Sequence, residues 1–486
     1  DELSTPARPT AQASEERRVA GADRQVALPA PSGSSPWLVR AVVLAQFAPA
    51  FLFSGIAVAL PATGAELQLS ATELGLVETI FLGSSAAFLL PAGRLCDVLD
   101  RGAVFRVTLV AFGLLAALAG LVTSAWALLL LRALQGVASA LLATSGPAWL
   151  VDLVPVERRG RVFGAMIGAA YLGLATGPLV AGFVVAHLGW RAVFFVGGAW
   201  VLLGGLPALW CRTRRTEPRG GTLHLPSTVL LALGMAAVIT AVSLADSAAV
   251  RWPWVAIAAL AFGTFVLVQP RLATPLLDLR ELLRNAALSR ALIVQLLLYL
   301  NAFCSIFLLS LFLQVTKGLE ARSAGLWLMI GSVVMACLAP SAGRLADRLR
   351  PDWLAAAGVT AVLGSSACGA LLDVASAPVA VGIVLALQGL GFGLFSSPNM
   401  AIIVGSLPRE RSGFASALAA QSRSIGMFTG MAVTSALLAS RFEGRPVGDD
   451  GMGVSATVHS AYVALLCTSV LALLVSAWPL LRRRGG

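Results

Sequence analysis

About fourteen apolar runs, joined by short polar connections, constrain this chain more than any other feature. Each is close to the roughly 20 residues that an α-helix needs to cross about 30 Å of hydrocarbon. Only 12% of all residues are charged, whereas a soluble domain has about 25%. We therefore predict an all-α integral membrane protein. The runs lie near Leu38–Pro61, Ala71–Ala92, Ala103–Ser124, Trp126–Val151, Val162–Ala186, Ala192–Cys211, Leu225–Leu244, Trp254–Val268, Ala291–Leu313, Ala324–Ser341, Trp353–Leu372, Val379–Val404, Gly413–Ala439 and Ala461–Leu481.

Arginine gathers at alternate connections, and this predicts the orientation. The rich connections hold Arg94 with Arg101, Arg158 with Arg159 and Arg161, Arg212 with Arg214 and Arg215, Arg280 with Arg284, Arg344 with Arg348, and Arg409 with Arg411. The others hold few basic residues, and the loop Arg441–Ser460 is the longest of them. By the positive-inside rule both termini are cytoplasmic, in a multi-pass protein of the cell (plasma) membrane. Residues 1–36 are polar and predict a disordered cytoplasmic tail.

A short charged motif occurs twice and predicts two related halves. Gly93-Arg94-Leu95-Cys96-Asp97 returns as Gly343-Arg344-Leu345-Ala346-Asp347, each time between two apolar runs. Internal duplication of this kind is typical of transporters. We predict six-helix bundles over residues 37–211 and 291–486. The linker 212–290 then holds two extra membrane helices, and an amphipathic stretch, Leu276–Arg290, that lies along the cytoplasmic surface.

Three motifs in order resemble one family. The G-R-L-x-D pattern at 93–97 resembles the loop between the second and third helices of the major facilitator superfamily. The stretch Leu131-Arg132-Ala133-Leu134-Gln135-Gly136 is similar to its fourth-helix motif. Gly173-x3-Gly177-Pro178-x2-Ala181-Gly182 is similar to the fifth-helix motif of its antiporters. The resemblance implies the major facilitator fold, two six-helix bundles with two extra central helices, and the fourteen-helix drug:proton antiporter branch.

The resemblance implies a cytoplasmic latch at Gly93, Asp97 and Arg101, with a second copy at Gly343 and Asp347. Taken as residues, Gly93 lets the helix end pack closely on a neighbour, and Asp97 can cap a helix N-terminus or pair with arginine. The alternative is a solvated loop that only sets the topology. Arginines alone satisfy the topology rule, so the carboxylate favours the latch. The family usually has Gly where Asp100 stands.

Glu78 and Arg132 lie inside apolar runs, where a charge is costly and marks function by default. An arginine cannot lose its proton in a protein, and the resemblance assigns Arg132 to proton coupling. Its alternative is a side chain that snorkels from the helix end to the surface. Glu78 can load and release a proton, or can lie near enough to the outer surface to stay wet. The acid that related antiporters carry in the first helix is absent, since Leu52 or a neighbour occupies its place.

Small and polar residues within the runs complete the candidate site. Gly173, Gly177, Pro178 and Gly182 predict close helix contact and a bend; the resemblance places that bend at the interface between the halves. Polar and aromatic residues within the spans are candidates to line a midplane cavity, or instead to form hydrogen bonds between helices. They are Gln46, Phe81, Tyr171, Gln295, Tyr299, Asn301, Gln388 and Asn399. Besides Glu78 and Arg132, Arg423 is the charge deep in a span, which favours an apolar or amphipathic substrate.

These observations favour a secondary active efflux transporter for multidrug efflux and antibiotic resistance, with proton-coupled antiport of hydrophobic or cationic drug-like compounds. The alternative is a lipid or specific-metabolite exporter of the same fold without proton coupling, which the missing first-helix acid favours. The sequence has no phosphate loop, Walker motif or metal-ligand cluster, so we expect no cofactor and no ATP hydrolysis. The histidines lie near span ends and form no cluster, which disfavours an enzyme. A sensor would need an extramembrane domain, and neither the tail nor any loop supplies one. We expect a monomer. We expect no binding of nucleic acid, because the net charge of +11 is scattered between apolar runs.

Overall fold

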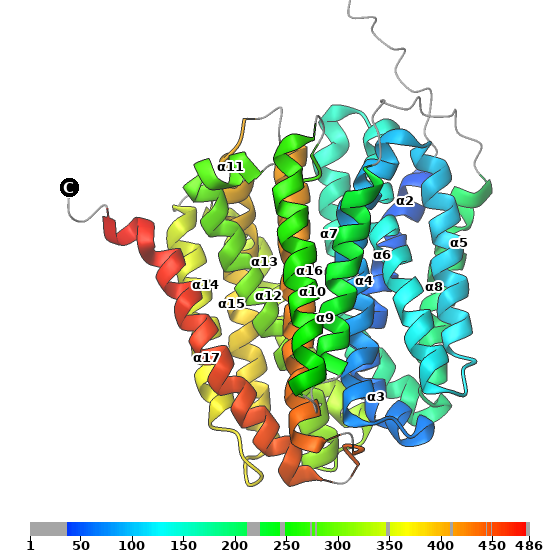
Figure 1. The fold of residues 1–486 in the computed structure, drawn as a ribbon, viewed down its shortest axis with the longest axis vertical. Coiled ribbons are helices and arrows are strands. Elements are labelled where there is room, and N and C mark those ends of the chain that lie inside the picture. Colours follow the sequence, from blue (N-terminus) through cyan, green and yellow to red (C-terminus); the bar gives the residue numbers. More distant parts are fainter. Residues whose placement is uncertain are drawn as a thin grey trace, which may run out of the picture.

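The computed structural model is an all-helical bundle whose long helices run roughly parallel (Figure 1). It describes residues 36–210, 224–243, 248–272, 275–277, 279–346, 350–408, 412–443, 445–448 and 450–482. Within this part of the chain, 14 helices are long and apolar enough to cross a membrane. The prediction of an all-α integral membrane protein is therefore confirmed.

The helices form two groups with a pair between them. The N-terminal half, as we use the term, comprises α2 (Pro36–Ala45), α3 (Phe47–Leu67), α4 (Ala71–Val98), α5 (Arg101–Ala119), α6 (Ala125–Leu153), α7 (Val156–Leu188) and α8 (Arg191–Trp210). The central segment holds α9 (Leu225–Ser243), α10 (Ala248–Val268), the 3-10 turn η1 (Gln269–Arg271) and α11 (Leu279–Arg284). The C-terminal half comprises α12 (Ala286–Leu311), the π-helical turn η2 (Phe312–Thr316), α13 (Ala321–Ala346), α14 (Pro351–Ala370), α15 (Pro378–Gly405), α16 (Ser412–Phe442) and α17 (Gly451–Arg482).

Polar residues begin several helices at the span boundaries. The Ser70 hydroxyl accepts a hydrogen bond from the Glu73 amide at 3.2 Å, and the Glu73 carboxylate accepts one from the Ser70 amide at 2.9 Å. This capping box satisfies donors that the first turn of α4 would otherwise leave unpaired. Asp100 and Asn285 cap α5 and α12 in the same way through one side-chain oxygen each. Local sequence thus fixes where each of these spans starts.

Among the boundaries that differ from the prediction, two helices begin earlier for a visible reason. The predicted loop Arg441–Ser460 is partly helical, because α17 already begins at Gly451. Asp450 accepts a hydrogen bond from the Gly453 amide at 2.8 Å and caps this extra turn, while Val454 and Val458 are buried. Likewise α12 begins at Ala286 instead of Ala291. The predicted amphipathic stretch therefore divides into the short helix α11, the capping residue Asn285 and the first residues of α12.

The halves meet along two lines, which we call the α4–α16 seam and the α7–α13 seam after the helices in contact. The helices α9 and α10 pack on each other, and α9 contacts both α4 and α16. In Figure 1 the green pair α9 and α10 stands in front, between the blue and the yellow-to-red groups. The extra pair therefore covers the α4–α16 seam.

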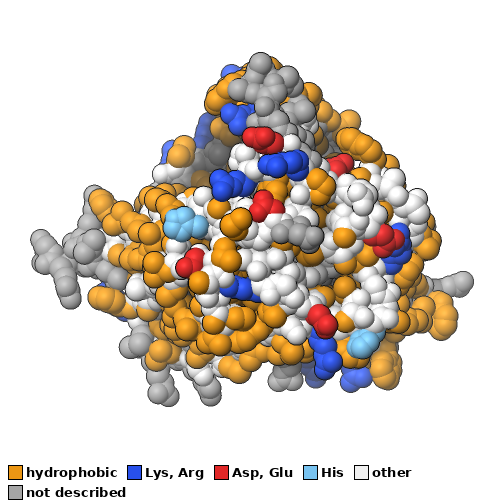
Figure 2. Space-filling view, turned by 90° about the horizontal axis from the view of Figure 1, so that it is seen from below, with side chains coloured by type: hydrophobic (Ala, Val, Ile, Leu, Met, Phe, Trp, Pro, Cys, Tyr) orange, Lys and Arg blue, Asp and Glu red, His pale blue; other side chains and the backbone are white. Residues whose placement is uncertain are grey.

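Apolar side chains fill the bundle and also cover its outside. Phe105, Phe112 and Trp149 are almost fully buried within the N-terminal half. Leu130 and Leu203 are exposed on its periphery, where an apolar surface suits lipid tails. At the end of the molecule where α3 ends, Figure 2 shows separated charges of both signs among uncharged and apolar side chains.

Candidate functional site

Glu78 on α4 and Arg132 on α6 form an ion pair inside the N-terminal half. Glu78 Oε1 and Arg132 Nη2 are 3.0 Å apart, and both side chains are 0% exposed. Arg132 therefore does not snorkel, and Glu78 is not a wet surface acid. Such a pair is costly to desolvate and needs further hydrogen bonds.

Neighbouring groups on both helices hold the guanidinium of Arg132. Its Nε donates a hydrogen bond to the Val77 carbonyl at 3.1 Å, and its Nη1 donates one to Gln135 Oε1 at 2.6 Å. The guanidinium carbon also lies 4.1 Å from the centre of the Phe81 ring, in cation–π geometry. The helices approach closely because Gly136 has no side chain: a Cβ there would lie 2.3 Å from the Phe81 carbonyl oxygen.

The ion pair lies beside the α4–α16 seam. The hydroxyl of Thr79, the residue after Glu78, hydrogen-bonds the Ser435 hydroxyl of the other half at 2.8 Å. Gly75 packs on the same serine, and the Gln421 side chain donates to the Ala86 carbonyl at 3.1 Å farther along α4. The helix that carries Glu78 is thus bonded directly to the C-terminal half.

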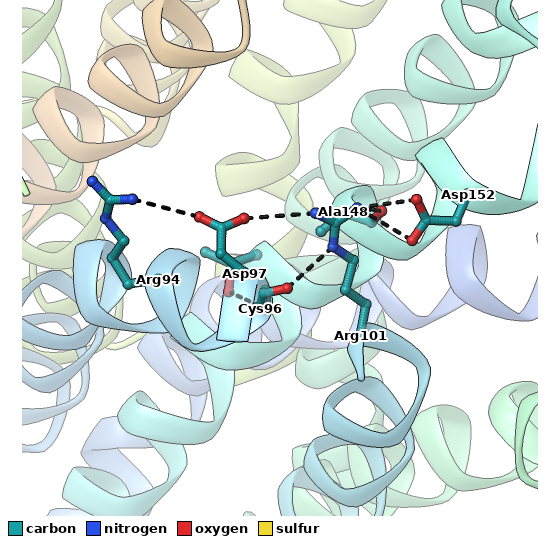
Figure 3. A network of polar contacts seen from close by, with 7 residues as sticks. Arg94, Cys96, Asp97, Arg101, Ala148 and Asp152 are labelled. Carbon is teal, nitrogen blue, oxygen red and sulfur yellow. Dashed lines mark hydrogen bonds and ion pairs between the residues drawn. The ribbon is translucent and has the colours of Figure 1, made fainter. Parts of the chain in front are cut away.

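A second charged cluster joins the adjacent ends of α4, α5 and α6 (Figure 3). Arg101 lies between two carboxylates, with Asp97 at 3.6 Å and Asp152 at 3.0 Å. Its side chain also donates hydrogen bonds to the carbonyls of Cys96 at 3.1 Å and Ala148 at 3.3 Å. Arg101 therefore connects three helix ends from a position where its side chain is 4% exposed.

The predicted latch residues differ from expectation in detail. Gly93 does not serve close packing, because nothing lies within 4 Å of a Cβ built on it and α4 continues to Val98. Asp97 pairs with arginines, Arg94 among them at 3.9 Å, while Asp100 caps α5. In the second copy, Gly343 lies within α13, and Asp347 lies outside the described residues.

Asp152, which the sequence motifs do not include, is the stronger partner of Arg101. The signal in the sequence is weak: one acid directly after the apolar run that ends at Val151. Its two carboxylate oxygens accept from Arg101 Nη1 at 3.0 and 3.2 Å. The Asp97 side chain is farther away and 39% exposed, so water screens that pair.

Asp152→Asn is expected to lower the free energy of unfolding by about 1–3 kcal/mol, because it weakens the charge-assisted bonds of a nearly buried arginine. Asp97→Asn, the matched control, is expected to cost less than about 1 kcal/mol. The measurement is the equilibrium unfolding of each purified variant in mixed micelles. Equal losses for the two variants would contradict the assignment of Asp152 as the main partner.

The glycine motif of α7 contacts two different helices. A Cβ on Gly173 would lie 2.4 Å from the Phe47 carbonyl oxygen, and one on Gly177 would lie 1.9 Å from the Ser54 hydroxyl, so both residues pack on α3. Gly182 instead packs on α13, where a Cβ would lie 2.5 Å from the Ala321 carbonyl oxygen. The carbonyl of Pro178 meets Gly325 of α13 equally closely. The last turns of α7 thus close one end of the α7–α13 seam.

Further contacts close the same end between α3 and the end of α12. Ser310 donates a hydrogen bond to the Ala57 carbonyl at 2.7 Å, and Gln314 donates one to the Val58 carbonyl at 3.2 Å. Each joins the C-terminal half to the N-terminal half. The halves are therefore held together where α3 and α7 end.

A cavity of about 600 Å³, open space at its mouth included, lies between the halves. It borders the α7–α13 seam, and its walls are mostly apolar and aromatic. Of the eight residues predicted to line a cavity, Tyr171, Tyr299 and Gln388 do so. The lining residues are Phe53, Tyr171, Leu174, Tyr299, Ala302, Phe303, Ile306, Leu328, Gly331, Ser332, Met335, Leu385, Gln388, Gly389 and Phe392.

The other predicted cavity residues form contacts between helices. Gln46 donates to the Leu142 carbonyl at 3.2 Å, and Phe81 faces Arg132. In the C-terminal half, Asn399 donates to Gln295 at 3.1 Å. Asn301 donates to the hydroxyls of Ser366 at 2.8 Å and Ser469 at 3.0 Å, and it accepts a bond from Gln388 at 3.4 Å. For these residues the alternative interpretation, contacts between helices, describes the structure.

Solved structures share this fold. A bacterial homolog of the human lysosomal transporter Spinster, in an inward-facing and unoccupied conformation, superimposes with a TM-score of 0.65. The match covers 91% of this chain and 98% of that one at 17% sequence identity. A mutant of the nucleoside transporter NupG matches with a TM-score of 0.62 at 13% identity, over 90% of this chain and 98% of that one.

Relatives with assigned functions include drug-resistance proteins. The puromycin resistance protein pur8 of Streptomyces alboniger is 29% identical over 465 residues, which are 90% of each chain. The multidrug efflux pump LfrA of Mycolicibacterium smegmatis is 30% identical over 78% of this chain and 75% of its own. The tetracenomycin C resistance and export protein of Streptomyces glaucescens is 27% identical over 79% of this chain and 72% of its own.

The family model of the Major Facilitator Superfamily matches residues 42–431 and 291–484. Together these ranges include the extra pair of helices and both halves except the first residues of α2. The family is one of transporters rather than enzymes, and the two solved structures are transporters too. The chain therefore belongs to the Major Facilitator Superfamily and is a multi-pass membrane transporter.

Proposed function

We propose that this protein exports hydrophobic or amphipathic compounds from the cell in exchange for protons, by alternating access. The observation that carries the proposal is the buried Glu78–Arg132 ion pair beside the α4–α16 seam. A carboxylate there can change its charge only by taking or giving a proton, and that change alters the electrostatic energy of a helix bonded to the other half. The drug-resistance relatives support efflux as the direction.

The cavity supports the proposed substrate class. Its aromatic walls, which include Phe53, Phe303 and Phe392, offer large apolar contact areas and few hydrogen-bonding groups. Phe53 and Phe303 stack across the halves with ring centroids 4.3 Å apart. A compound bound there touches both halves, so its binding free energy depends on how they are arranged.

The proposed cycle uses the two charged clusters differently. Protonation of Glu78 neutralises one partner of the ion pair and leaves the Arg132 charge uncompensated, which favours a new arrangement of α4 against α16. The cluster of Asp97, Arg101 and Asp152 holds the ends of α4, α5 and α6 as one unit during that movement. By resemblance to the loop motif of the family, we assign a latch role to this cluster and to Gly343 and Asp347.

We further infer that both termini face the cytoplasm, in the cell membrane. The end near the α4–α5 junction carries Arg94 and Arg101, and Arg158 and Arg350 lie at matching connections. The positive-inside rule assigns that end to the cytoplasm. The end of the molecule at which α3 and α7 end, and at which the halves are held together, then faces outward.

Substrate-driven proton movement in proteoliposomes tests the proposal. The purified protein is reconstituted in vesicles that contain a pH-sensitive dye, and a panel of hydrophobic and amphipathic compounds is added. We expect at least one compound to change the internal pH in protein-containing vesicles and not in protein-free vesicles, which control for weak bases that cross lipid unaided. If no compound does so in vesicles shown to hold folded protein, proton-coupled efflux is wrong and uncoupled lipid or metabolite export is the next hypothesis.

A further inference from the structure

Three polar side chains from three helices meet near the middle of the bundle. The hydroxyls of Tyr171 on α7 and Tyr299 on α12 are 3.5 Å apart, so they link the two halves. Arg423 on α16 is near enough to Tyr299 for its positive charge to act on the Tyr299 hydroxyl. The Tyr299 ring is held edge-on against Phe392, with centroids 5.3 Å apart. Both tyrosines line the cavity, so this polar cluster stands at its edge.

Arg423 faces the space between the halves. One side of α16 packs on α12, where Ser422 donates a hydrogen bond to the Leu292 carbonyl at 2.7 Å. Another side packs on α4, where Gln421 and Phe428 make contact. Arg423 is exposed although it lies within the α16 span, and its charge acts on Tyr299. Arg423 is thus exposed next to Tyr299, which lines the cavity.

No carboxylate balances this charge among the residues that the structure describes. The ion pairs there involve Arg94, Arg101, Arg132 and Arg191, and Arg423 is in none of them. The lining of the cavity contains no Asp, Glu, Lys, Arg or His. The other mid-span charges in this part of the chain, Glu78 and Arg132, compensate each other. Among the described residues, the Arg423 charge near the cavity thus has no carboxylate partner.

We infer that the cavity selects amphipathic anions: compounds with an aromatic body and one carboxylate or phenolate group. The anionic group binds the guanidinium of Arg423 and the hydroxyls of Tyr299 and Tyr171, while the rings lie against the aromatic wall. A charge in a membrane span is costly unless paired, and an anionic ligand supplies the missing partner through charge-assisted hydrogen bonds. That such anions are transported rests on the proposed function, whereas their binding does not. The inference departs from the sequence-based expectation of cationic compounds.

Binding of three matched fluorescent probes tests the inference without any ion gradient. The probes are pyrenebutyrate, its primary amide and pyrenebutylamine, which share one aromatic body and differ in charge. Each is titrated against the purified protein in nanodiscs, with empty nanodiscs subtracted. We expect saturable binding that is tightest for the anion, and a loss of roughly tenfold to a hundredfold in anion affinity on Arg423→Gln, as for one charge-assisted hydrogen bond. The same change is expected to alter amide binding less than about twofold.

Control variants separate charge from folding. Arg423→Lys keeps the charge and is expected to keep the preference for the anion, while Arg290→Gln removes an arginine at the start of α12, outside the cavity lining, and is expected to change nothing. The inference is overturned if the native protein binds no anion saturably, if the amine binds as tightly as the anion, or if Arg423→Gln weakens all three probes equally. A native protein that binds the anion but moves no protons would refute the proposed coupling and leave the anion preference intact.

Discussion

Arg132→Ala is expected to lower the free energy of unfolding by about 3–5 kcal/mol, because it leaves Glu78 buried without its counter-charge. The loss includes the hydrogen bonds to the Val77 carbonyl and to Gln135, and the contact with Phe81. If Glu78 takes up a proton instead, it remains a buried polar group without its partner, which is also unfavourable. The measurement is equilibrium unfolding in mixed micelles, followed by tryptophan fluorescence.

A double replacement separates the stability of the pair from its function. Glu78→Leu with Arg132→Met fills the site with apolar side chains, and we expect it to recover most of the lost stability. We also expect it to abolish substrate-driven proton movement, because no titratable group is left between α4 and α6 at this site. The single variant Glu78→Gln is expected to lose proton movement too, whereas Glu320→Gln, at an exposed acid, is expected to keep it. Proton movement in the stable double variant would exclude the pair as the coupling site.

Gly182→Val is expected to reduce the transport rate at least tenfold, which corresponds to about 1.4 kcal/mol. The larger side chain forces open the closed end of the α7–α13 seam without unfolding either half. A Cβ at this position would lie 2.5 Å from the Ala321 carbonyl oxygen, and backbone cannot rotate away as a flexible side chain can. Contacts between the halves are affected, but the helix pairs within each half are not. The readout is the distance distribution between spin labels at positions 188 and 320, in a background without native cysteines.

Gly168→Val on the same helix is the matched control, since nothing lies within 4 Å of a Cβ built there. We expect it to keep both the native distance distribution and the transport rate. Gly182→Val is expected to add a population with longer distances. If Gly182→Val gives the native distribution, the contact with Ala321 does not hold this end closed.

Sequence alone predicted the fold because the length and polarity of each span are local properties. The capping residues Ser70 and Asp100 show why most boundaries lay close to their predicted places. The early start of α17 was not predicted, because a glycine-rich stretch favours a loop, whereas the Asp450 carboxylate caps a helix there. The composition of a loop is a weaker signal than one well-placed carboxylate.

The candidate site was predicted as separate residues and not as pairs. Glu78 and Arg132 each stood out as charges in apolar runs, but their contact depends on how α4 and α6 pack, which the glycine at 136 permits. Asp152 lay at a span end, where acids are common, so nothing marked it as the partner of Arg101. The polar residues Gln295 and Asn301 were equally good candidates for a cavity or for helix contacts, because the sequence does not say which side of a helix faces the other half.

The extra helices α9 and α10 have a consequence for how substrates arrive. They cover the α4–α16 seam, whereas the cavity borders the opposite seam, between α7 and α13. An amphipathic compound dissolves in the bilayer before it meets the protein, so the uncovered flank gives it the shorter route. The pair thus makes the two membrane-facing flanks unequal, and we expect compounds of the proposed class to enter from the lipid on the uncovered flank.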